Sequence, residues 1–313
     1  MYRVKDLFEQ HGVRLELELI AGSAGLQRTI LVPQANRPGI SLAGYMKGYA
    51  NKRILIFGRL EFLYLKDLDA KTRNSRIRAL LSPQTPAVII ARKHKAPKEL
   101  VDLCEEKEIP LLRAGMSTMN LLSRLTLLLA EEFAPSVDCH GTLVEVFGIG
   151  VLIQGESSVG KSEAALGLIE RGHRLISDDI VRVKKKEANF LEGRGIALTR
   201  HLMEIRGIGI INVAYLYGAV CVREAKSIDI IVKLEEWDDS KYYDRVGIEE
   251  KNELILEIPV PCHILPVKPG RDVVLLLETI ALNHRLKLLG YHSAKEFQSK
   301  LLDTISNKEE NLE

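Results

Sequence analysis

Eight consecutive residues of this chain have the types and the spacing of a phosphate-binding loop. They read Gly155-Glu156-Ser157-Ser158-Val159-Gly160-Lys161-Ser162. In a Gly-x4-Gly-Lys-Ser pattern, backbone N–H groups surround the phosphates while the following helix presents its positive end to them. We expect Lys161 to reach the β and γ phosphates of ATP, and the Ser162 hydroxyl to ligate Mg²⁺. The loop predicts a nucleotide and a metal but leaves the phosphoryl acceptor open.

Two adjacent carboxylates, Asp178 and Asp179, follow 17 and 18 residues after Lys161. Near a bound phosphate, one carboxylate can take the proton from the attacking group while the other serves the metal. An Asp-Asp pair elsewhere is usually a solvated turn or a helix N-cap. Beside a phosphate loop we favour phosphoryl transfer, and the sequence does not decide which aspartate is the base.

The elements around the loop occur in the order that such a site requires. Residues 143–147 and 151–153 flank Gly148-Ile149-Gly150 and predict a short hairpin or bent strand that enters the loop. Residues 161–171 predict a helix, with Gly172 at the position where helices commonly end. The sequence therefore predicts a strand, a glycine loop and a helix in succession.

The rest of this half is also rich in strands. Residues 180–184 and 189–191 bracket a lysine-rich turn, and residues 228–234 predict another strong strand. Residues 272–278 read as a strand followed by a helix at 279–289. The capping-box run Ser293-Ala294-Lys295-Glu296 predicts a final helix to about Ile305.

The first half of the chain carries no catalytic motif. Strands at 86–91 and 109–112, joined by an amphipathic stretch that opens at Pro97, predict a βαβ unit. A long helix over 117–133 then ends before Pro135. We therefore expect an N-terminal α/β domain over residues 1–134 and a catalytic domain over residues 135–313.

The composition is that of an ordinary globular protein and excludes several classes. Hydrophobic residues make up 46%, and 44 basic against 42 acidic residues leave a formal charge of +2, too balanced for a nucleic-acid surface. No secretory signal or apolar run of about 18 residues is found, so we expect a cytoplasmic protein without membrane contact. The cysteines show no zinc or redox spacing. Motifs of guanine-specific NTPases, transporter ATPases and eukaryotic-type protein kinases are absent from the sequence.

Several further stretches, in a fixed order, carry a resemblance to a known family. The most specific is the run Met203-Glu204-Ile205-Arg206-Gly207-Ile208-Gly209-Ile210-Ile211-Asn212. The others include Arg37-Pro38-Gly39, His140-Gly141, Tyr243-Asp244-Arg245-Val246-Gly247 and Pro266-Val267-Lys268-Pro269-Gly270-Arg271. Together with the phosphate loop they resemble the bacterial HPr kinase/phosphorylase family, and the resemblance covers essentially the whole chain.

The resemblance implies a bifunctional enzyme. It would phosphorylate a serine of the phosphocarrier protein HPr with ATP and Mg²⁺, and remove that phosphate with inorganic phosphate to give pyrophosphate. The family assigns catalytic positions to His140, Lys161, Asp179 and Arg245, and metal positions to Ser162 and Glu204. Either Asp178 or Asp179 would exchange the proton in both directions. The resemblance also implies an α/β fold, with a murein-ligase-like first domain and a second domain like phosphoenolpyruvate carboxykinase, a homohexamer, and a role in carbon catabolite repression.

Two segments are expected to contact phosphate. Without the resemblance, residues 203–212 would read as a strand with a glycine bend, while Glu204 and Arg206 offer both charges beside Gly207 and Gly209. In residues 266–271, two prolines stiffen a loop that presents Lys268 and Arg271. The family links this second segment to dephosphorylation.

The chain departs from the family pattern at two positions. Most members carry glycine where this chain has Ser158, and if that position needs a positive φ the serine costs about 1 kcal/mol. Lys268 stands where arginine is usual, which removes a bidentate fork. Two rival functions stay open on the same loop architecture, namely a kinase of a small metabolite and a non-catalytic nucleotide-sensing regulator.

Overall fold

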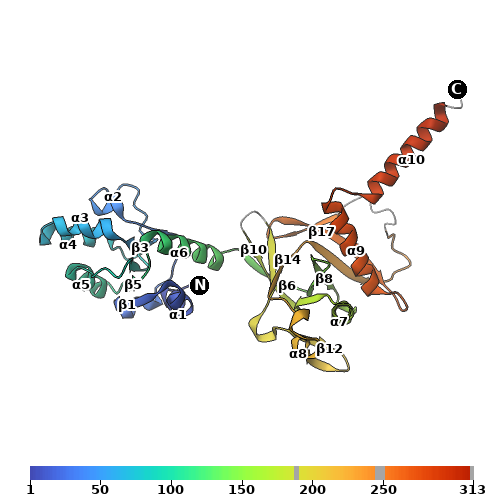
Figure 1. The fold of residues 1–313 in the computed structure, drawn as a ribbon, viewed down its shortest axis with the longest axis horizontal. Helices are drawn as coiled ribbons and strands as arrows, with labels where there is room; N and C mark the ends of the chain where they lie inside the picture. Colours follow the sequence, from blue (N-terminus) through green and yellow to red (C-terminus); the bar gives the residue numbers. More distant parts are fainter. Residues whose placement is uncertain (187–189, 244–250, 311–313) are drawn as a thin grey trace. The chain divides into compact units, whose positions relative to one another are not determined.

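Two compact units make up the chain, residues 1–134 and residues 135–313, and Figure 1 labels their elements. The computed structural model describes residues 1–186, 190–243 and 251–310. Each unit is a mixed α/β structure with its own sheets. Within the described ranges, no helix is long and apolar enough to cross a membrane.

The first unit holds a five-stranded sheet with the spatial order β1-β5-β4-β3-β2. Its strands are β1 (Leu17–Ala21), β2 (Ala35–Asn36), β3 (Ile54–Phe57), β4 (Val88–Ile90) and β5 (Leu111–Ala114). All neighbouring pairs are parallel except β1 with β5. The helical segments are α1 (Val4–Leu15), η1 (Ser23–Gln27), α2 (Gly39–Leu42), α3 (Arg59–Asp67), α4 (Ala70–Leu80), α5 (Lys98–Glu106) and α6 (Thr118–Glu132).

Helices cover both faces of this sheet. Leu55 and Phe57 of β3 join the core beneath α3, α4 and α5, whereas Ile54 and Ile56 join the core beneath α1 and α6. Successive strand residues point to opposite faces, so a strand buried on both sides is apolar throughout. The expected βαβ unit is confirmed as β4, α5 and β5, and the long helix as α6, whereas β3 was not predicted.

The second unit holds a six-stranded sheet, a four-stranded sheet and a hairpin. The six-stranded order is β16-β17-β15-β8-β7-β9 and the four-stranded order is β14-β11-β10-β6. The strands are β6 (Ser136–His140), β7 (Thr142–Val146), β8 (Ile149–Gly155), β9 (Arg174–Ser177), β10 (Ile180–Lys185), β11 (Leu191–Gly195), β12 (Leu202–Ile205), β13 (Gly209–Asn212), β14 (Ala225–Ser227), β15 (Ile230–Glu236), β16 (Lys251–Ile255) and β17 (Ile258–Val267). The helical segments are α7 (Lys161–Glu170), η3 (Ala197–Thr199), α8 (Val213–Tyr217), η4 (Ala219–Cys221), α9 (Val273–Leu288) and α10 (Ser293–Glu310).

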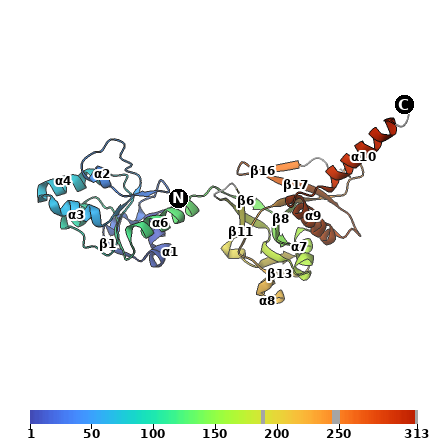
Figure 2. The ribbon, with the colours of Figure 1, turned by 45° about the horizontal axis from the view of Figure 1, so that its top comes forward.

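These elements form three layers, with the six-stranded sheet in the middle. On one face, α7, α9 and the β12–β13 hairpin bury one core, and Figure 2 shows α7 beside α9. On the other face, β10 and β11 of the four-stranded sheet bury a second core. The phosphate loop joins β8, an inner strand of the six-stranded sheet, to α7 on one face of that sheet. Its two ends are therefore held by two different layers.

The hairpin predicted before the loop is confirmed. β7 and β8 pair antiparallel from Thr142↔Ile153 to Val146↔Ile149, which leaves a two-residue turn. Both turn residues have positive φ, 49° at Phe147 and 83° at Gly148, as a type I′ turn requires. The helix predicted at 161–171 is confirmed as α7, with Gly172 at φ 89° just after its end.

The strand predicted at 272–278 is wrong. These residues open the single helix α9, whose N-cap is Asp272, because the Asp272 carboxylate accepts from the Leu275 N–H at 2.9 Å. The run Val273–Leu277 reads as a strand locally, but packing against α7 decides the outcome. A Cβ at Gly167 of α7 would lie only 2.6 Å from the Val274 side chain, so the two helices approach closely.

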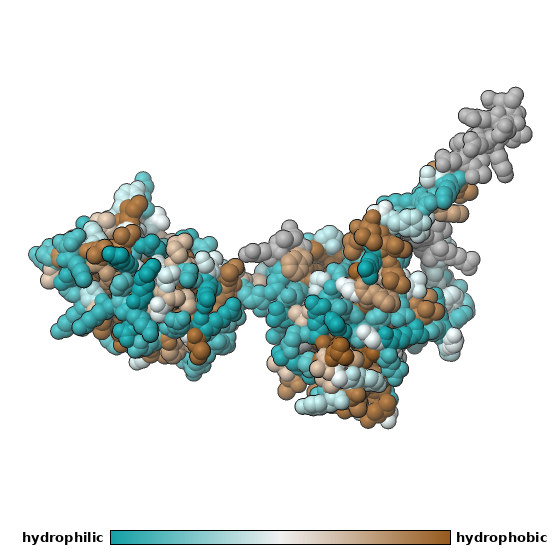
Figure 3. All heavy atoms as spheres, viewed as in Figure 1, coloured by the Kyte–Doolittle hydropathy of each residue, from teal (hydrophilic) through white to brown (hydrophobic). Residues whose placement is uncertain are grey.

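Exposed hydrophobic side chains gather around β13 and α8. They are Ile208, Ile210, Tyr215, Leu216 and Val220, and we call this set the α8 patch. Figure 3 shows hydrophobic surface at the end of the second unit where Figure 1 places β12 and α8. Apolar surface gathered in one place on a globular protein is typical of an interaction site.

Candidate active site

The phosphate loop joins the end of β8 to the start of α7. Gly155, the last residue of β8, has φ 145°, and a Cβ there would lie 2.4 Å from the Leu234 carbonyl oxygen of the neighbouring strand. Gly160 caps α7 at φ 97°. Both positions require glycine, because a side chain would collide at the first and favour another backbone conformation at the second. These glycines direct the first turn of α7 toward the loop.

Lys161 lies over the loop that precedes it. Its ammonium group donates to the carbonyl oxygens of Gly155 at 2.9 Å and Glu156 at 2.8 Å. The positive charge is therefore held against the same stretch of backbone that the motif uses to surround phosphate. A phosphoryl group in the loop would meet this ammonium and the N-terminal end of α7 together.

Asp178 is buried next to Ser162. Only 6% of it is exposed, and the Ser162 hydroxyl lies 3.1 Å from each of its carboxylate oxygens. The Thr142 hydroxyl donates to Oδ1 at 2.7 Å and the Glu204 N–H approaches Oδ2 at 3.4 Å. Both oxygens of this carboxylate therefore accept hydrogen bonds from within the protein.

The Ser162–Asp178 pair supplies only oxygen donors, which suits Mg²⁺. Glu204 brings its backbone to this pair, while its side chain lies on the exposed side of β12. No group of three or more His, Cys, Asp or Glu side chains gathers to hold a metal among the described residues.

Asp179 faces the opposite way from its neighbour. Its φ is 66°, a left-handed conformation that aspartate tolerates better than most residues. The Gly141 N–H donates to its carbonyl oxygen at 2.9 Å, and β10 pairs with β6 through Ile180↔His140. The result is an Asp179 carboxylate 3.9 Å from the His140 imidazole, with 83% and 85% of the two side chains exposed.

Arg206 connects the segment 203–212 to the phosphate loop. β12 and β13 form an antiparallel hairpin whose turn includes Gly207 at φ 82°, so the expected strand with a glycine bend is confirmed. The Arg206 guanidinium donates to the Ser157 hydroxyl at 3.2 Å and to the Ser158 hydroxyl. Ser158 itself has φ 77°, so the conformational cost expected for a serine at this position applies.

The segment 266–271 lies at the same sheet edge but makes its own contacts. β8, β15 and β17 are parallel neighbours, so their carboxyl ends share one edge, and β17 is about 10 Å from β8 at the usual strand spacing. Beyond β17, the Lys268 ammonium lies 4.6 Å from the centroid of the Trp237 ring and the Arg271 guanidinium 5.8 Å from it. Arg271 and Trp237 also line a pocket of about 1200 Å³. Arg245 lies outside the described residues.

A cluster of charges fastens the end of α7 to α9. Arg171 and His173 contact the Glu278 carboxylate at 2.8 and 2.9 Å, and Glu278 is only 14% exposed. Burial alone would raise the pKa of Glu278, but the hydrogen bonds from His173 and Arg171 lower this pKa overall. The clamp, as we call Arg171, His173 and Glu278, supports the helix that carries Lys161 and Ser162.

Sequence reasoning missed Thr142. Its hydroxyl fixes Asp178 from the start of β7, and it is fully buried. No spacing rule indicates it, because Thr142 and Asp178 are 36 residues apart and meet only when β7 pairs with β9. A buried threonine directly after the quoted His140-Gly141 run was the one available signal.

Comparison with known proteins places this chain in a family. The family model described as HPr Serine kinase N terminus matches residues 2–129, and the one described as HPr Serine kinase C-terminal domain matches residues 131–301. A solved structure, the Hpr(Ser) kinase/phosphatase from Coxiella burnetii, is 37% identical with a TM-score of 0.47, and covers 51% of this chain and 98% of its own.

Curated relatives extend the similarity over nearly the whole chain. The HPr kinase/phosphorylase of Bacillus pumilus (strain SAFR-032) is 43% identical over 305 residues, which is 97% of each chain. That of Bacillus subtilis (strain 168) is 42% identical over 308 residues, which is 98% of each chain. These matches confirm the resemblance drawn from the sequence, and this chain belongs to the HPr kinase/phosphorylase family.

Proposed function

We propose that this chain transfers the γ-phosphoryl group of ATP to a serine of HPr and removes it again by phosphorolysis, acting in the cytoplasm in carbon catabolite repression. Family membership supports the substrate. The observation that carries the chemistry is the division between Asp178, buried against Ser162, and Asp179, exposed beside His140. The two neighbouring carboxylates thus have different surroundings, one held against the phosphate loop and the other exposed to solvent.

In the kinase direction, the loop N–H groups and Lys161 bind the triphosphate and orient its γ-phosphorus. Asp178 holds the Ser162 hydroxyl, and these two groups, with Glu204 nearby, would hold Mg²⁺, which offsets phosphate charge when bound. Asp179 accepts the proton of the HPr seryl hydroxyl as its oxygen attacks phosphorus. The bond to the β,γ-bridging oxygen breaks and ADP leaves.

In the phosphorylase direction, inorganic phosphate attacks the phosphorus of phosphoserine. The seryl oxygen leaves and takes the proton that Asp179 now returns, and the attacking phosphate becomes pyrophosphate. His140 and Arg245 would orient the exposed carboxylate and the transferring group, and Lys268 and Arg271 would bind phosphate at the neighbouring strand end. One acid/base group then serves both directions.

The choice of Asp179 as the base rests on access. Both oxygens of Asp178 already accept hydrogen bonds inside the protein, so a seryl hydroxyl of a separate protein has no approach to them. Asp179 is exposed and makes no hydrogen bond through its carboxylate to the phosphate loop among the described residues. A general base must lie within hydrogen-bond reach of the proton that it takes, and the exposure of Asp179 supports its assignment to this role.

The proposal includes a protein partner and a homohexamer. The α8 patch belongs to the hairpin segment that contacts the loop through Arg206, and apolar surface of this kind suits a protein rather than a small metabolite. A hexamer predicts a sedimentation mass of six times the 35.1-kDa chain. The likenesses of the first unit to murein ligases and of the second to phosphoenolpyruvate carboxykinase belong to the same proposal.

The direct test is incubation of the protein with γ-labelled ATP, Mg²⁺ and purified HPr. Label on an HPr serine is expected, followed by its release as labelled pyrophosphate when ATP is replaced by inorganic phosphate. A parallel ATP-binding measurement shows that the loop is functional. Binding of ATP without label on HPr would contradict the proposal and favour a nucleotide sensor or a kinase of a small metabolite.

A further inference from the structure

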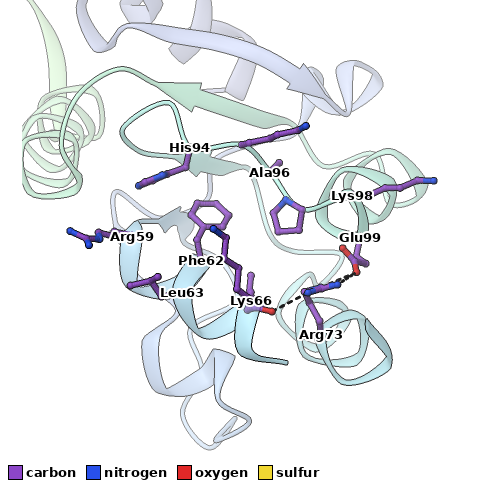
Figure 4. A pocket seen from close by; sticks show the side chains of 12 residues that line it. Arg59, Phe62, Leu63, Lys66, Arg73, His94, Ala96, Lys98 and Glu99 are labelled. Carbon is purple, nitrogen blue, oxygen red and sulfur yellow. Dashed lines mark hydrogen bonds and ion pairs between the residues drawn. The ribbon is translucent and has the colours of Figure 1, made fainter. Parts of the chain in front are cut away.

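A pocket of about 590 Å³ lies in the first unit, at the carboxyl ends of the parallel strands β3 and β4. Its lining comes from one face of α3, where Arg59, Phe62 and Lys66 recur at helical spacing, and from residues 94–99 after β4. Figure 4 shows Phe62 and His94 meeting between these two segments. Ligands of open parallel sheets bind at this end of the strands, and the volume suits a small molecule.

The backbone that leads into this pocket is held in an unusual conformation. Arg92 and Lys93, the residues just before His94, have φ values of 59° and 52° although neither is glycine. Their N–H groups donate at 2.9 Å to the carbonyl oxygens of Met116 and Ala114, respectively. Left-handed conformations are strained for residues other than glycine and persist where the surroundings impose them, often at binding sites. Here they direct residues 94–97 across the strand ends.

The charges around the pocket are almost all positive. Glu99 is its one acidic residue, and it is already paired with Arg73 at 2.7 Å. Arg59, Lys66 and Lys95 make no ion pair or hydrogen bond through their side chains in the described part of the chain, and Lys98 adds a fourth cation in the first turn of α5. The helix N-terminus contributes further positive potential. The rim therefore suits an anionic group.

The floor is apolar, with one polar atom unsatisfied. Phe62 is 7% exposed and Leu65 is fully buried, and the Phe62 and His94 rings lie 5.5 Å apart between centroids. The Nε2 atom of His94 is buried and has no hydrogen-bond partner. Burying a polar atom without a partner is unfavourable, so the His94 ring is held in the pocket wall at an energetic cost.

We propose that this pocket is a second ligand site, for a small phosphorylated molecule that carries a ring. The ring would lie on the apolar floor at Phe62 and Pro97, beside the His94 ring. The phosphate would lie among Arg59, Lys66, Lys95 and Lys98. The site is separate from the phosphate loop, because every residue of the lining belongs to the first unit.

The test is calorimetric titration of the full chain with AMP, which has both a ring and a phosphate. The phosphate loop is first saturated with Mg²⁺ and a non-hydrolysable ATP analogue, so that AMP reports on any other site. We expect one further AMP per chain. The double variant Lys66→Glu with Lys95→Glu should bind AMP at least about tenfold more weakly, because two attractive charges become repulsive. Adenosine and inorganic phosphate alone should each bind at least about tenfold more weakly than AMP.

The matched control reverses two other exposed lysines of the same unit, Lys47 and Lys71, which do not line the pocket. This variant has the same net charge as the test variant and should bind AMP as the wild type does. Circular dichroism of both variants checks that the fold is retained. Absence of AMP binding up to about 10 mM, equal weakening in the control, or wild-type affinity in the test variant would each overturn the proposal; so would inorganic phosphate binding as tightly as AMP.

Discussion

Two loops of this chain follow parallel strands and lead into helices, yet only one is visible in the sequence. The phosphate loop after β8 uses Gly155 and Gly160 where φ is positive, with Ser158 as the exception. In the loop after β4, the residues with positive φ are Arg92 and Lys93. Glycine adopts this conformation without strain, whereas other residues must be held in it by their neighbours.

The difference teaches how each site is specified. Glycines at fixed spacing specify the phosphate loop locally, so a short sequence motif indicates both the shape of the loop and its ligand. The loop after β4 is specified by distant backbone, since Met116 and Ala114 hold Arg92 and Lys93 in place. Such a site leaves no motif, and the cations of its rim are spread from Arg59 to Lys98.

The largest expected effect is a loss of phosphoryl transfer at the phosphate loop that leaves the pocket of the first unit unchanged. Asp179→Asn should lower transfer to HPr and phosphorolysis by about 10²–10⁴-fold, the usual contribution of a general base. Affinity for Mg-ATP should stay near wild type, because Asp179 makes no hydrogen bond to the loop in the described structure. AMP binding at the first unit should not change. Single-turnover rates in both directions and calorimetric affinities measure these quantities.

Asp178→Asn is the matched variant, since it changes the same residue type one position away. It should weaken Mg-ATP binding as well as transfer, because its carboxylate holds the Ser162 hydroxyl and accepts from Thr142. The assignment of roles would be reversed if Asp179→Asn kept near-normal transfer while Asp178→Asn abolished transfer with nucleotide affinity intact.

The two aspartates also show the limit of sequence reasoning. The pair was found because it follows a phosphate loop, but identical neighbouring residues carry no information about which is buried. That depends on the left-handed conformation of Asp179, where φ is 66°, and on Gly141 and Thr142 of the facing segment. Burial of a polar group is a property of tertiary packing.

Local pattern failed at α9 for a related reason. Val273 and Val274 with three following leucines favour a strand by propensity, yet Asp272 caps a helix there and Gly167 lets α7 approach it. Propensity is a weak preference that tertiary contacts override. The β7–β8 hairpin and α7 were predictable because their glycines and periodicity act within a few residues.

A smaller effect concerns the clamp that supports the phosphate loop. Glu278→Gln should destabilise the second unit by about 2 kcal/mol at neutral pH, because His173 and Arg171 lose a charged, largely buried partner. The folded-state pKa of Glu278 is lowered, so its stabilisation is present above the unfolded-state pKa and is lost as pH falls through the folded value. Unfolding midpoints of wild type and variant should therefore begin to converge as pH falls below the ordinary glutamate pKa of about 4.3.

The control is Glu106→Gln, which removes the carboxylate of an exposed Arg78–Glu106 pair in the first unit. Its effect should be much smaller, because solvent screens an exposed pair. Equal destabilisation by both variants at neutral pH, or a Glu278→Gln effect that does not change down to pH 3, would show that the clamp does not stabilise the second unit.

The smallest expected effect tests whether the positive φ of non-glycine residues in the two loops costs stability. Lys93→Gly should raise the free energy of unfolding by about 0.5–1 kcal/mol, since it relieves a left-handed residue at some cost in unfolded-state entropy. Ser158→Gly relieves the same strain but removes the hydroxyl that accepts from Arg206, so its net change should be close to zero. Chemical denaturation measures both values.

Alanine at each position separates strain from contact, because it keeps the left-handed penalty. Lys93→Ala should be near neutral, whereas Ser158→Ala should be destabilising by about 0.5–1 kcal/mol through the lost hydrogen bond alone. If Lys93→Gly is stabilising and Ser158→Gly is not, the Arg206 contact is what lets this chain keep serine in a loop position where glycine is usual. If both glycine variants gain the same stability, the Arg206 contact contributes nothing, and the strain at Ser158 is tolerated without compensation.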